Sequence, residues 1–402
     1  MLNFEDALKA ILDSAPELAV EKVPALYAES RILAQDVKAR EGFPPFDNSS
    51  RDGFALSANA VKNATRQHPV KLTVLDVIKA GSPAPQRAAG PGECYKIMTG
   101  APIPPGADAV VMREYADELE GAAAIWRPAE TGENIRRQNA DTNPGDIILK
   151  RGAKVRSFET ALLAGQGIEE ISVFKKPRVA VIPTGDELAA ANDGWHIRDS
   201  NGPGLCAALE SMGAAPLRFA PVADTLKAQK EAFAFAADSA DIVLISGGVS
   251  VGDFDFTGAA LNELGFKRIF WKVALKPGKP LLFGTLPARG KNIPVFGLPG
   301  NPLSTLVGAE LFVRPLIERM CAAQPAFPWL EGKVSNGCEL EPGRRNFLFC
   351  RAAWKDGFEI EILRGQDSNM LSSACKANAL AMAQDGATAL SSGDKITFRF
   401  LA

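Results

Sequence analysis

Between residues 177 and 320 the chain alternates short apolar runs with helical patterns, and this alternation restricts the possible folds more than any other feature. Apolar runs rich in Val and Ile are typical of strands buried on both faces. Helical patterns between such runs indicate strand–loop–helix units, and hence an α/β domain with a mostly parallel sheet. Strands are expected at 178–183, 217–221, 241–245, 269–273 and 293–298, and helices at 202–212, 226–237, 257–264 and 303–320.

Three of the expected strands run into loops that are rich in Gly, Asp, Asn or Pro, at 183–188, 246–255 and 298–302. The carboxyl ends of parallel strands lie at one edge of a sheet, and ligands bind at that edge in open α/β folds. We therefore expect the three loops to form one binding site.

The loop at 246–255 is the most informative of the three. Its glycines expose backbone N–H groups that suit phosphate oxygens, and Gly247 and Gly252 have the spacing of a P-loop. A P-loop continues with Lys and then Ser or Thr, whereas Asp253 follows here, so the segment is not a Walker A site. Asp253 and Asp255 would repel a phosphate unless a cation lay between them, and this predicts a Mg²⁺ ion held by carboxylates and phosphates.

Two pairs of charged residues have both a structural and a functional interpretation. Asp186 and Glu187 follow an expected strand, where they either begin a helix or bind the same metal ion. The acidic loop at 246–255 favours the metal. Lys276 and Lys279 flank a proline–glycine turn, which is either a solvated loop or a rigid source of positive charge for an oxyanion.

Three uncharged or mixed segments are also ambiguous. The segment 202–204 matches a dinucleotide-binding fingerprint loosely, but polar residues 199–201 precede it instead of a strand, so a helix cap is favoured. Residues 300–302 predict a helix start whose free N–H groups either bind an anion or are capped. Residues 47–52 are typical of a turn rich in Asp and Asn.

The flanking parts of the chain predict other architectures. Residues 1–40 have helical apolar spacing, and a further helix is expected at 158–165. Residues 47–146 alternate short β-like runs with Pro/Gly turns, which indicates a mostly β domain. The strands expected there lie at 70–77, 94–98, 109–112 and 123–126, and those of a small C-terminal β domain at 346–351, 358–363 and 395–400.

Composition excludes several classes of function. A net charge of -2 gives no overall field for nucleic acid or acidic membranes, and no apolar run reaches membrane-spanning length. Six cysteines without C-x-x-C spacing indicate neither a zinc site nor a disulfide framework. Two histidines argue against a His-based metal centre or a Ser-His-Asp triad. We expect a cytoplasmic protein with reduced thiols.

Eight motifs together resemble the molybdopterin molybdenumtransferase family, the MoeA type that is related to the C-terminal domain of gephyrin. They span nearly the whole chain in the family's order, at 46–55, 97–102, 106–111, 132–136, 184–188, 246–252, 276–280 and 298–302.

The resemblance implies a homodimer of four-domain chains. It implies a three-layer α/β molybdopterin-binding domain (1–20 and 172–324), a linking domain (21–40 and 147–171), a mostly β domain (41–146) and a C-terminal β-barrel (325–402). The site would form between the α/β domain of one protomer and the β domain of the other. The reaction would be Mg²⁺-dependent insertion of molybdate into adenylylated molybdopterin, with release of AMP, and the chain would contact the molybdopterin adenylyltransferase.

The resemblance also assigns site residues by position in the motifs. Those used for activity would be Asp52, Thr99, Asp141, Glu187, Asp224 and Asp255, of which the first three would come from the facing protomer. The metal would be held by Glu187, Asp224 and Asp255. The substrates would be bound by Gly247, Gly248, Ser250, Gly252, Lys276, Lys279, Pro299 and Pro302.

Three departures from the family pattern concern these motifs. Arg51 replaces an expected methionine beside Asp52, Asn139-Ala140 replaces Gly-Glu before Asp141, and Asp367 replaces a glycine before Ser368. An Arg51 side chain paired with Asp52 would change its electrostatics. Two alternative functions stay open, namely a tungstate-inserting paralogue and a non-catalytic scaffold of the gephyrin type.

Overall fold

The computed structural model describes residues 1–188, 195–248, 256–325 and 327–401. The chain divides into two units, of which the first contains Met1–Gln35, Arg151–Thr160 and Glu170–Ala402 and the second Asp36–Lys150 and Ala161–Glu169. The four domain boundaries expected from the sequence stay a prediction.

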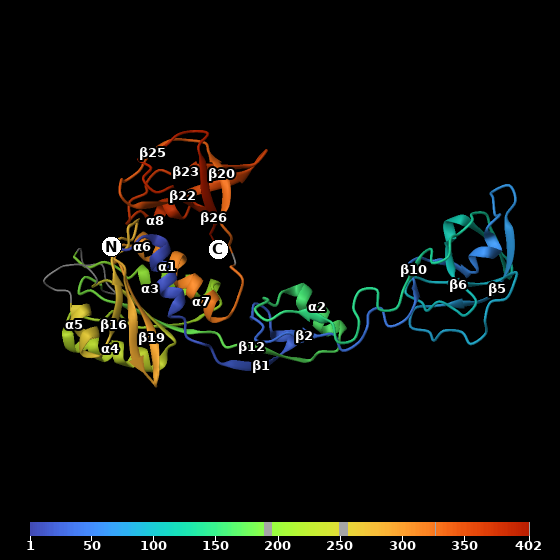
Figure 1. The fold of residues 1–402 in the computed structure, drawn as a ribbon, viewed down its shortest axis with the longest axis horizontal. Coiled ribbons are helices and arrows are strands. Elements are labelled where there is room, and N and C mark those ends of the chain that lie inside the picture. The colour runs from blue at the N-terminus through green and yellow to red at the C-terminus, as the bar shows by residue number, and fades with distance from the viewer. Residues whose placement is uncertain (189–194, 249–255, 326, 402) are drawn as a thin grey trace. The chain divides into compact units, whose positions relative to one another are not determined.

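The α/β part of the first unit is built on a six-stranded sheet (Figure 1). Its strands, in spatial order, are β14 (Ala215–Arg218), β13 (Arg178–Pro183), β15 (Ile242–Ser246), β19 (Lys291–Leu298), β18 (Leu282–Ala288) and β16 (Lys267–Trp271). The first four are parallel to one another, and β18 and β16 add antiparallel pairings. The predicted α/β class is confirmed, although β18 was not predicted.

Helices cover both faces of this sheet, because successive strand residues point to opposite sides. Val179 and Val181 join one core, and Ala180 and Ile182 join the other. The first face carries α1 (Phe4–Asp13), α3 (Asn201–Ser211), α6 (Pro302–Gly308) and α7 (Arg314–Met320), with a π-helix, η4 (Ala309–Val313), between the last two. The second face carries α4 (Leu226–Ser239) and α5 (Phe256–Glu263) (Figure 1).

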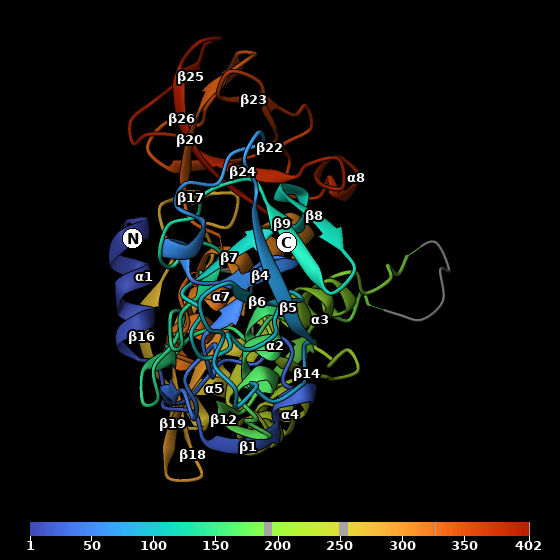
Figure 2. The same cartoon turned by 90° about the vertical axis from the view of Figure 1, so that its right-hand side faces the viewer.

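A closed barrel of five strands forms the C-terminal part of the first unit, as Figure 2 shows from a second direction. Its strands, in order, are β22 (Arg345–Trp354), β23 (Phe358–Ile362), β20 (Leu330–Val334), β26 (Lys395–Phe400) and β24 (Ala379–Met382). Pairing of β24 with β22 closes the barrel around a core that includes Phe398. Smaller elements are β17 (Leu275–Lys276), which pairs with β22, the ribbon of β21 (Cys338–Glu339) and β25 (Ala389–Leu390), and α8 (Leu371–Ala374).

The expectation of helix throughout residues 1–40 is wrong after α1. Residues Val20–Pro24 form strand β1, which pairs antiparallel with β12 (Glu170–Phe174), and a 3-10 turn, η1 (Ala25–Tyr27), follows. Pro16 and Pro24 interrupt the helical pattern, and the alternating exposure of β1 is that of a strand.

The second unit contains a six-stranded, mostly antiparallel sheet, and its predicted β character is confirmed. Its strands, in order, are β7 (Ala109–Met112), β4 (Gly53–Leu56), β6 (Glu93–Ile97), β5 (Val70–Ile78), β9 (Ala122–Ile125) and β8 (Ala116–Leu119). Two ribbons accompany it, β3 (Asn48–Ser49) with β10 (Ile135–Arg136) and β2 (Val37–Lys38) with β11 (Ile147–Leu149). The remaining elements are η2 (Ala58–Val61), η3 (Arg113–Tyr115) and α2 (Ser157–Gly165), which begins in the first unit and ends in the second.

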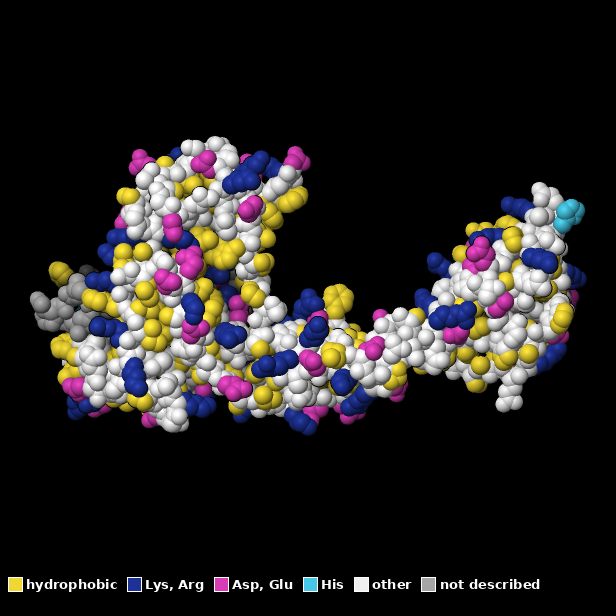
Figure 3. All heavy atoms as spheres, viewed as in Figure 1, with side chains coloured by type: hydrophobic (Ala, Val, Ile, Leu, Met, Phe, Trp, Pro, Cys, Tyr) yellow, Lys and Arg dark blue, Asp and Glu magenta, His cyan; other side chains and the backbone are white. Residues whose placement is uncertain are grey.

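The surface carries charges of both signs. Basic and acidic side chains are interspersed over the face that Figure 3 shows. Within the described ranges, no helix is long and apolar enough to cross a membrane.

Candidate functional site

A cavity of about 500 Å³ lies at the carboxyl ends of β13, β15 and β19. It is lined by Thr184 after β13, by Ser246 at the end of β15 and by Asn301 after β19. The three strand ends therefore meet at one hollow, at the edge of the sheet where ligands bind in this class of fold. Of the predicted site residues, Glu187 and Pro302 line this cavity.

The turn after β15 requires glycine at two consecutive positions. Gly247 and Gly248 both have left-handed backbones, with φ of 103° and 61°. A Cβ at Gly247 would overlap the Thr184 carbonyl, and one at Gly248 would overlap the Thr257 hydroxyl. The Gly247 N–H donates to the Leu298 carbonyl at 3.1 Å, so this amide serves the sheet and not a phosphate. The predicted site residues Ser250, Gly252 and Asp255 lie outside the described residues.

The acidic residues after β13 and β14 are held by hydrogen bonds to each other and to Gln229 of α4. The Asp224 N–H donates to Asp186 Oδ1 at 3.0 Å, and Asp224 Oδ1 accepts from Gln229 Nε2 at 3.1 Å. The Glu187 carboxylate turns back over Gly185, where a Cβ would overlap it. The sequence left Asp186 and Glu187 as either the start of a helix or ligands of a metal ion. In the structure, it is Asp186 that forms a hydrogen bond with Asp224.

The predicted metal set is only partly within the part of the chain that the structure describes. In those ranges, no three His, Cys, Asp or Glu residues are grouped as a metal site requires. Glu187 and Asp224 supply the oxygen donors that Mg²⁺ prefers. Because Asp255 lies outside the ranges, the metal set stays a prediction.

The two predicted lysines differ in their surroundings. Lys276 Nζ forms an ion pair with Glu341 Oε2 at 3.0 Å, and this hydrogen bond is the main cause of the lowered pKa of Glu341. Arg344 pairs with the same carboxylate at 2.9 Å. Lys279 has no ion pair among the residues that the structure covers, and the turn between the lysines packs at Gly278 near the Ser304 carbonyl of α6.

The start of α6 is capped by the chain itself. Pro302 occupies the first turn, the Leu303 N–H donates to the Ser368 carbonyl at 2.9 Å, and the Thr305 hydroxyl donates to the Pro299 carbonyl. Of the two interpretations of this helix start, capping therefore applies to Leu303. The capping carbonyl follows Asp367, one of the departures from the family pattern.

The second unit brings two predicted residues together. Asp52 Oδ1 accepts hydrogen bonds from Thr99 N and Thr99 Oγ1, both at 2.7 Å. These bonds, the backbone one first, lower the pKa of Asp52. Asp141 is exposed, and its N–H donates to the Phe43 carbonyl at 2.9 Å. Within the covered ranges, Arg51 forms no ion pair with Asp52.

Asn201 is among the cavity residues that sequence reasoning missed. Asn201, at the start of α3, lines the cavity and donates to both Ser246 and Gly300. Its only sequence signal was the polar run at 199–201, which was interpreted as a helix cap.

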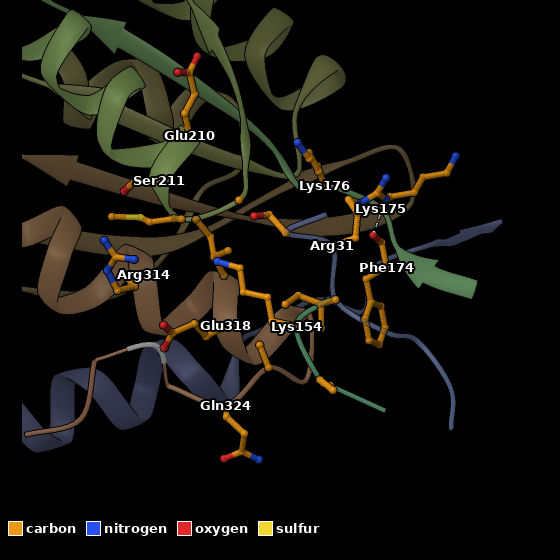
Figure 4. A pocket seen from close by; sticks show the side chains of 18 residues that line it. Arg31, Lys154, Phe174, Lys175, Lys176, Glu210, Ser211, Arg314, Glu318 and Gln324 are labelled. Atoms are coloured by element: carbon orange, nitrogen blue, oxygen red, sulfur yellow. Dashed lines mark hydrogen bonds between the residues drawn. The ribbon is translucent and has the colours of Figure 1, made fainter. Parts of the chain in front are cut away.

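A second cavity, of about 410 Å³, lies elsewhere in the first unit (Figure 4). Lys154, Lys175 and Lys176 line it together with Glu210 and Glu318, so its charges are mixed (Figure 4). None of the predicted site residues lines it.

Three family models match this chain in succession. The MoeA N-terminal region (domain I and II) matches residues 2–167, a probable molybdopterin binding domain matches 180–319, and the MoeA C-terminal region (domain IV) matches 331–401. A molybdopterin molybdenumtransferase of Nostoc sp. is 34% identical over 407 residues, which cover 98% of this chain and 93% of the relative. The chain belongs to the molybdopterin molybdenumtransferase family.

Further similarities, to a second transferase and to a solved structure, support this family membership. The molybdopterin molybdenumtransferase of Staphylococcus aureus strain Mu50 is 38% identical over 330 residues, 81% of this chain and 78% of the relative. The crystal structure of the molybdopterin biosynthesis moeA protein from Pyrococcus horikoshii OT3 is 27% identical, covers 100% of both chains and has a TM-score of 0.86. The multidomain fold that the resemblance implied is thus confirmed.

Proposed function

We propose that this protein inserts molybdate into adenylylated molybdopterin and releases AMP and molybdenum cofactor. The observation that carries the proposal is the similarity to a named molybdopterin molybdenumtransferase over 98% of the chain. The cavity at the ends of β13, β15 and β19 supports it, because its lining falls largely within the residues that match a molybdopterin binding domain.

The lining of the cavity suits a phosphorylated ligand. Thr184 and Ser246 present hydroxyl groups, and Asn301 presents an amide at the start of α6. Such groups donate hydrogen bonds to phosphate oxygens. We place the diphosphate of the substrate here, where hydrolysis of its phosphoanhydride would separate AMP from the pterin.

Mg²⁺ and lysines would supply the positive charge that the reaction needs. Glu187, Asp224 and Asp255 would hold the ion, which when bound screens the diphosphate from these carboxylates. Lys276 and Lys279 would bind molybdate oxygens. To do so, Lys276 would leave its ion pair with Glu341 and contact the oxyanion instead.

A second copy of the chain and a second enzyme complete the proposal. We place Asp52, Thr99 and Asp141 in the site of a facing protomer of a homodimer. The adenylylated substrate requires an adenylyltransferase upstream, and we propose direct contact with that enzyme.

The test is to incubate the pure protein with adenylylated molybdopterin, molybdate and Mg²⁺ and to measure AMP. We expect AMP release that requires Mg²⁺ and is lost in Glu187→Ala, whose dimer stays intact. Tungstate in place of molybdate decides between the two oxyanions. If neither oxyanion gives AMP release, the proposal is contradicted and the non-catalytic scaffold is the function that remains.

A further inference from the structure

We infer that Asn201 is a positioning residue that sets the spacing of two loops around the candidate site. The inference rests on the proposed function, because it concerns the cavity in which we place the nucleotide. It adds a residue that the family motifs identified in the sequence do not include.

The side-chain amide of Asn201 connects the ends of two strands. Asn201 Nδ2 donates to Ser246 Oγ at 2.8 Å, at the end of β15, and to the Gly300 carbonyl at 2.7 Å, after β19. A carbonyl oxygen only accepts hydrogen bonds, so the contact with Gly300 determines which end of the amide is the nitrogen. One NH₂ group therefore holds two walls of the cavity at a fixed separation.

The start of α3 keeps Asn201 in place. Asp199 Oδ1 accepts from the Gly202 N–H at 2.8 Å, and Asp199 Oδ2 accepts from Arg218 Nη2 at 3.0 Å. A Cβ at Gly202 would overlap the Asp199 carboxylate. Because Arg218 belongs to β14, the helix start is anchored to the sheet on the side away from β19.

The oxygen of the Asn201 amide argues against a role in fold stability alone. Asn201 Oδ1 is buried and has no hydrogen-bond partner within the described part of the chain. An unpaired buried acceptor destabilises a fold, and its removal offsets part of the loss of two hydrogen bonds. Deleting the side chain should therefore alter the cavity more than it alters the stability of the fold.

The experiment measures AMP binding to the full chain by calorimetry. We expect Asn201→Ala to weaken AMP binding by about tenfold, because the two walls of the cavity are no longer held at one separation. Asn201→Asp should weaken it further, because a carboxylate repels both the Gly300 carbonyl and the nucleotide phosphate.

The matched control is Asn3→Ala, at the start of α1. Asn3 Oδ1 accepts from the Asp6 N–H at 2.7 Å and caps that helix, and Asn3 does not line the cavity. Asn3→Ala should lower the melting temperature and leave AMP affinity unchanged. In the AMP-release assay, Asn201→Ala should raise KM for the adenylylated substrate, whereas a merely structural defect would lower kcat at constant KM.

The outcomes separate this inference from the proposed function. If the unmodified protein binds no AMP, both are contradicted. If it binds AMP and Asn201→Ala binds it equally well, the role of Asn201 alone is contradicted. If Asn201→Ala does not fold, the nearly isosteric Asn201→Asp decides, and unchanged affinity in that variant also overturns the inference.

Discussion

Thr99 is the main neighbour that lowers the pKa of the Asp52 carboxylate. Both of its hydrogen bonds come from Thr99, one from the backbone and one from the hydroxyl, and together they hold its pKa below the ordinary 3.8. Arg113 adds a smaller electrostatic contribution in the same direction. Asp52 is thus ionised at neutral pH although no cation pairs with it within the covered ranges.

Replacing Thr99 by Val tests this control. Thr99→Val keeps the backbone bond and loses the hydroxyl bond, so the pKa of Asp52 should rise toward 3.8 without reaching it. A depressed native pKa stabilises the fold above the unfolded pKa, and that stabilisation is lost as pH falls through the native pKa. As the pH is lowered, Thr99→Val should therefore lose the stabilisation that ionised Asp52 provides at a higher pH than the parent protein does. Carbon-13 NMR of the carboxylates measures the pKa, and Thr99→Ser should leave it unchanged.

The ion pair of Lys276 with Glu341 gives a second prediction. The pair is partly exposed, with 42% and 34% of the side chains accessible, so Glu341→Gln should change the free energy of unfolding by less than about 1 kcal/mol. Removing the competing carboxylate should lower KM for molybdate by about two- to fivefold, the equivalent of a surface ion pair. An unchanged or higher KM would argue against a role for Lys276 in binding the oxyanion.

At the scale of elements, buried charges join the α/β part of the first unit to its barrel. Glu310, in η4, accepts from Arg314 Nε at 2.9 Å and pairs with Arg399 Nη2 of β26 at 3.0 Å. All three residues are buried. Desolvation is the main cause of the lowered pKa of Arg399, and the charge of Glu310 opposes it. The carboxylate therefore compensates two buried cations.

Glu310→Ala should accordingly be strongly destabilising. It removes the carboxylate that both buried guanidinium groups contact, and breaking a buried pair costs about 3–5 kcal/mol. Urea denaturation of the variant measures the loss. Asp13→Ala removes an exposed pair with Lys9 and should cost less than about 0.5 kcal/mol. Equal effects of the two substitutions would contradict the account of the network.

The elements also show where sequence reasoning succeeds and where it fails. Strands β13, β15 and β19 were predictable because their apolar runs are buried on both faces. Strand β18 contains Gly284 and Pro287, residues that normally weaken or end a strand. Strand β1 is defined by its partner β12, which lies far along the chain.

Part of the candidate site was predictable from the sequence, and part was not. The three strand-end loops were predictable from local patterns, and they meet at the cavity. The contacts of Asn201 with Gly300 and of Lys276 with Glu341 join residues far apart in the sequence. No local pattern encodes such contacts, so they became visible only in the folded chain.

At the scale of the whole molecule, the division into two units predicts two unfolding events. Gly53, in the second unit, has no room for a side chain, because a Cβ would overlap the Val111 carbonyl of β7. Gly53→Ala should destabilise the second unit by about 1–3 kcal/mol through overpacking. Calorimetry should show one transition shifted to lower temperature and the other unchanged.

The matched control is a glycine with open space in the same unit. Gly165 ends α2, and a Cβ there would have no neighbour within 4 Å. Gly165→Ala should leave the transition in place or raise it slightly, because Ala restricts the unfolded chain. A single transition that shifts as a whole in Gly53→Ala would contradict the independence of the two units.

The most direct test of the central claim is a crystal structure of the protein with bound AMP and molybdate. The account predicts nucleotide density in the cavity between Thr184, Ser246 and Asn301, at the carboxyl ends of β13, β15 and β19. Nucleotide bound elsewhere, with this cavity holding only water, would contradict it.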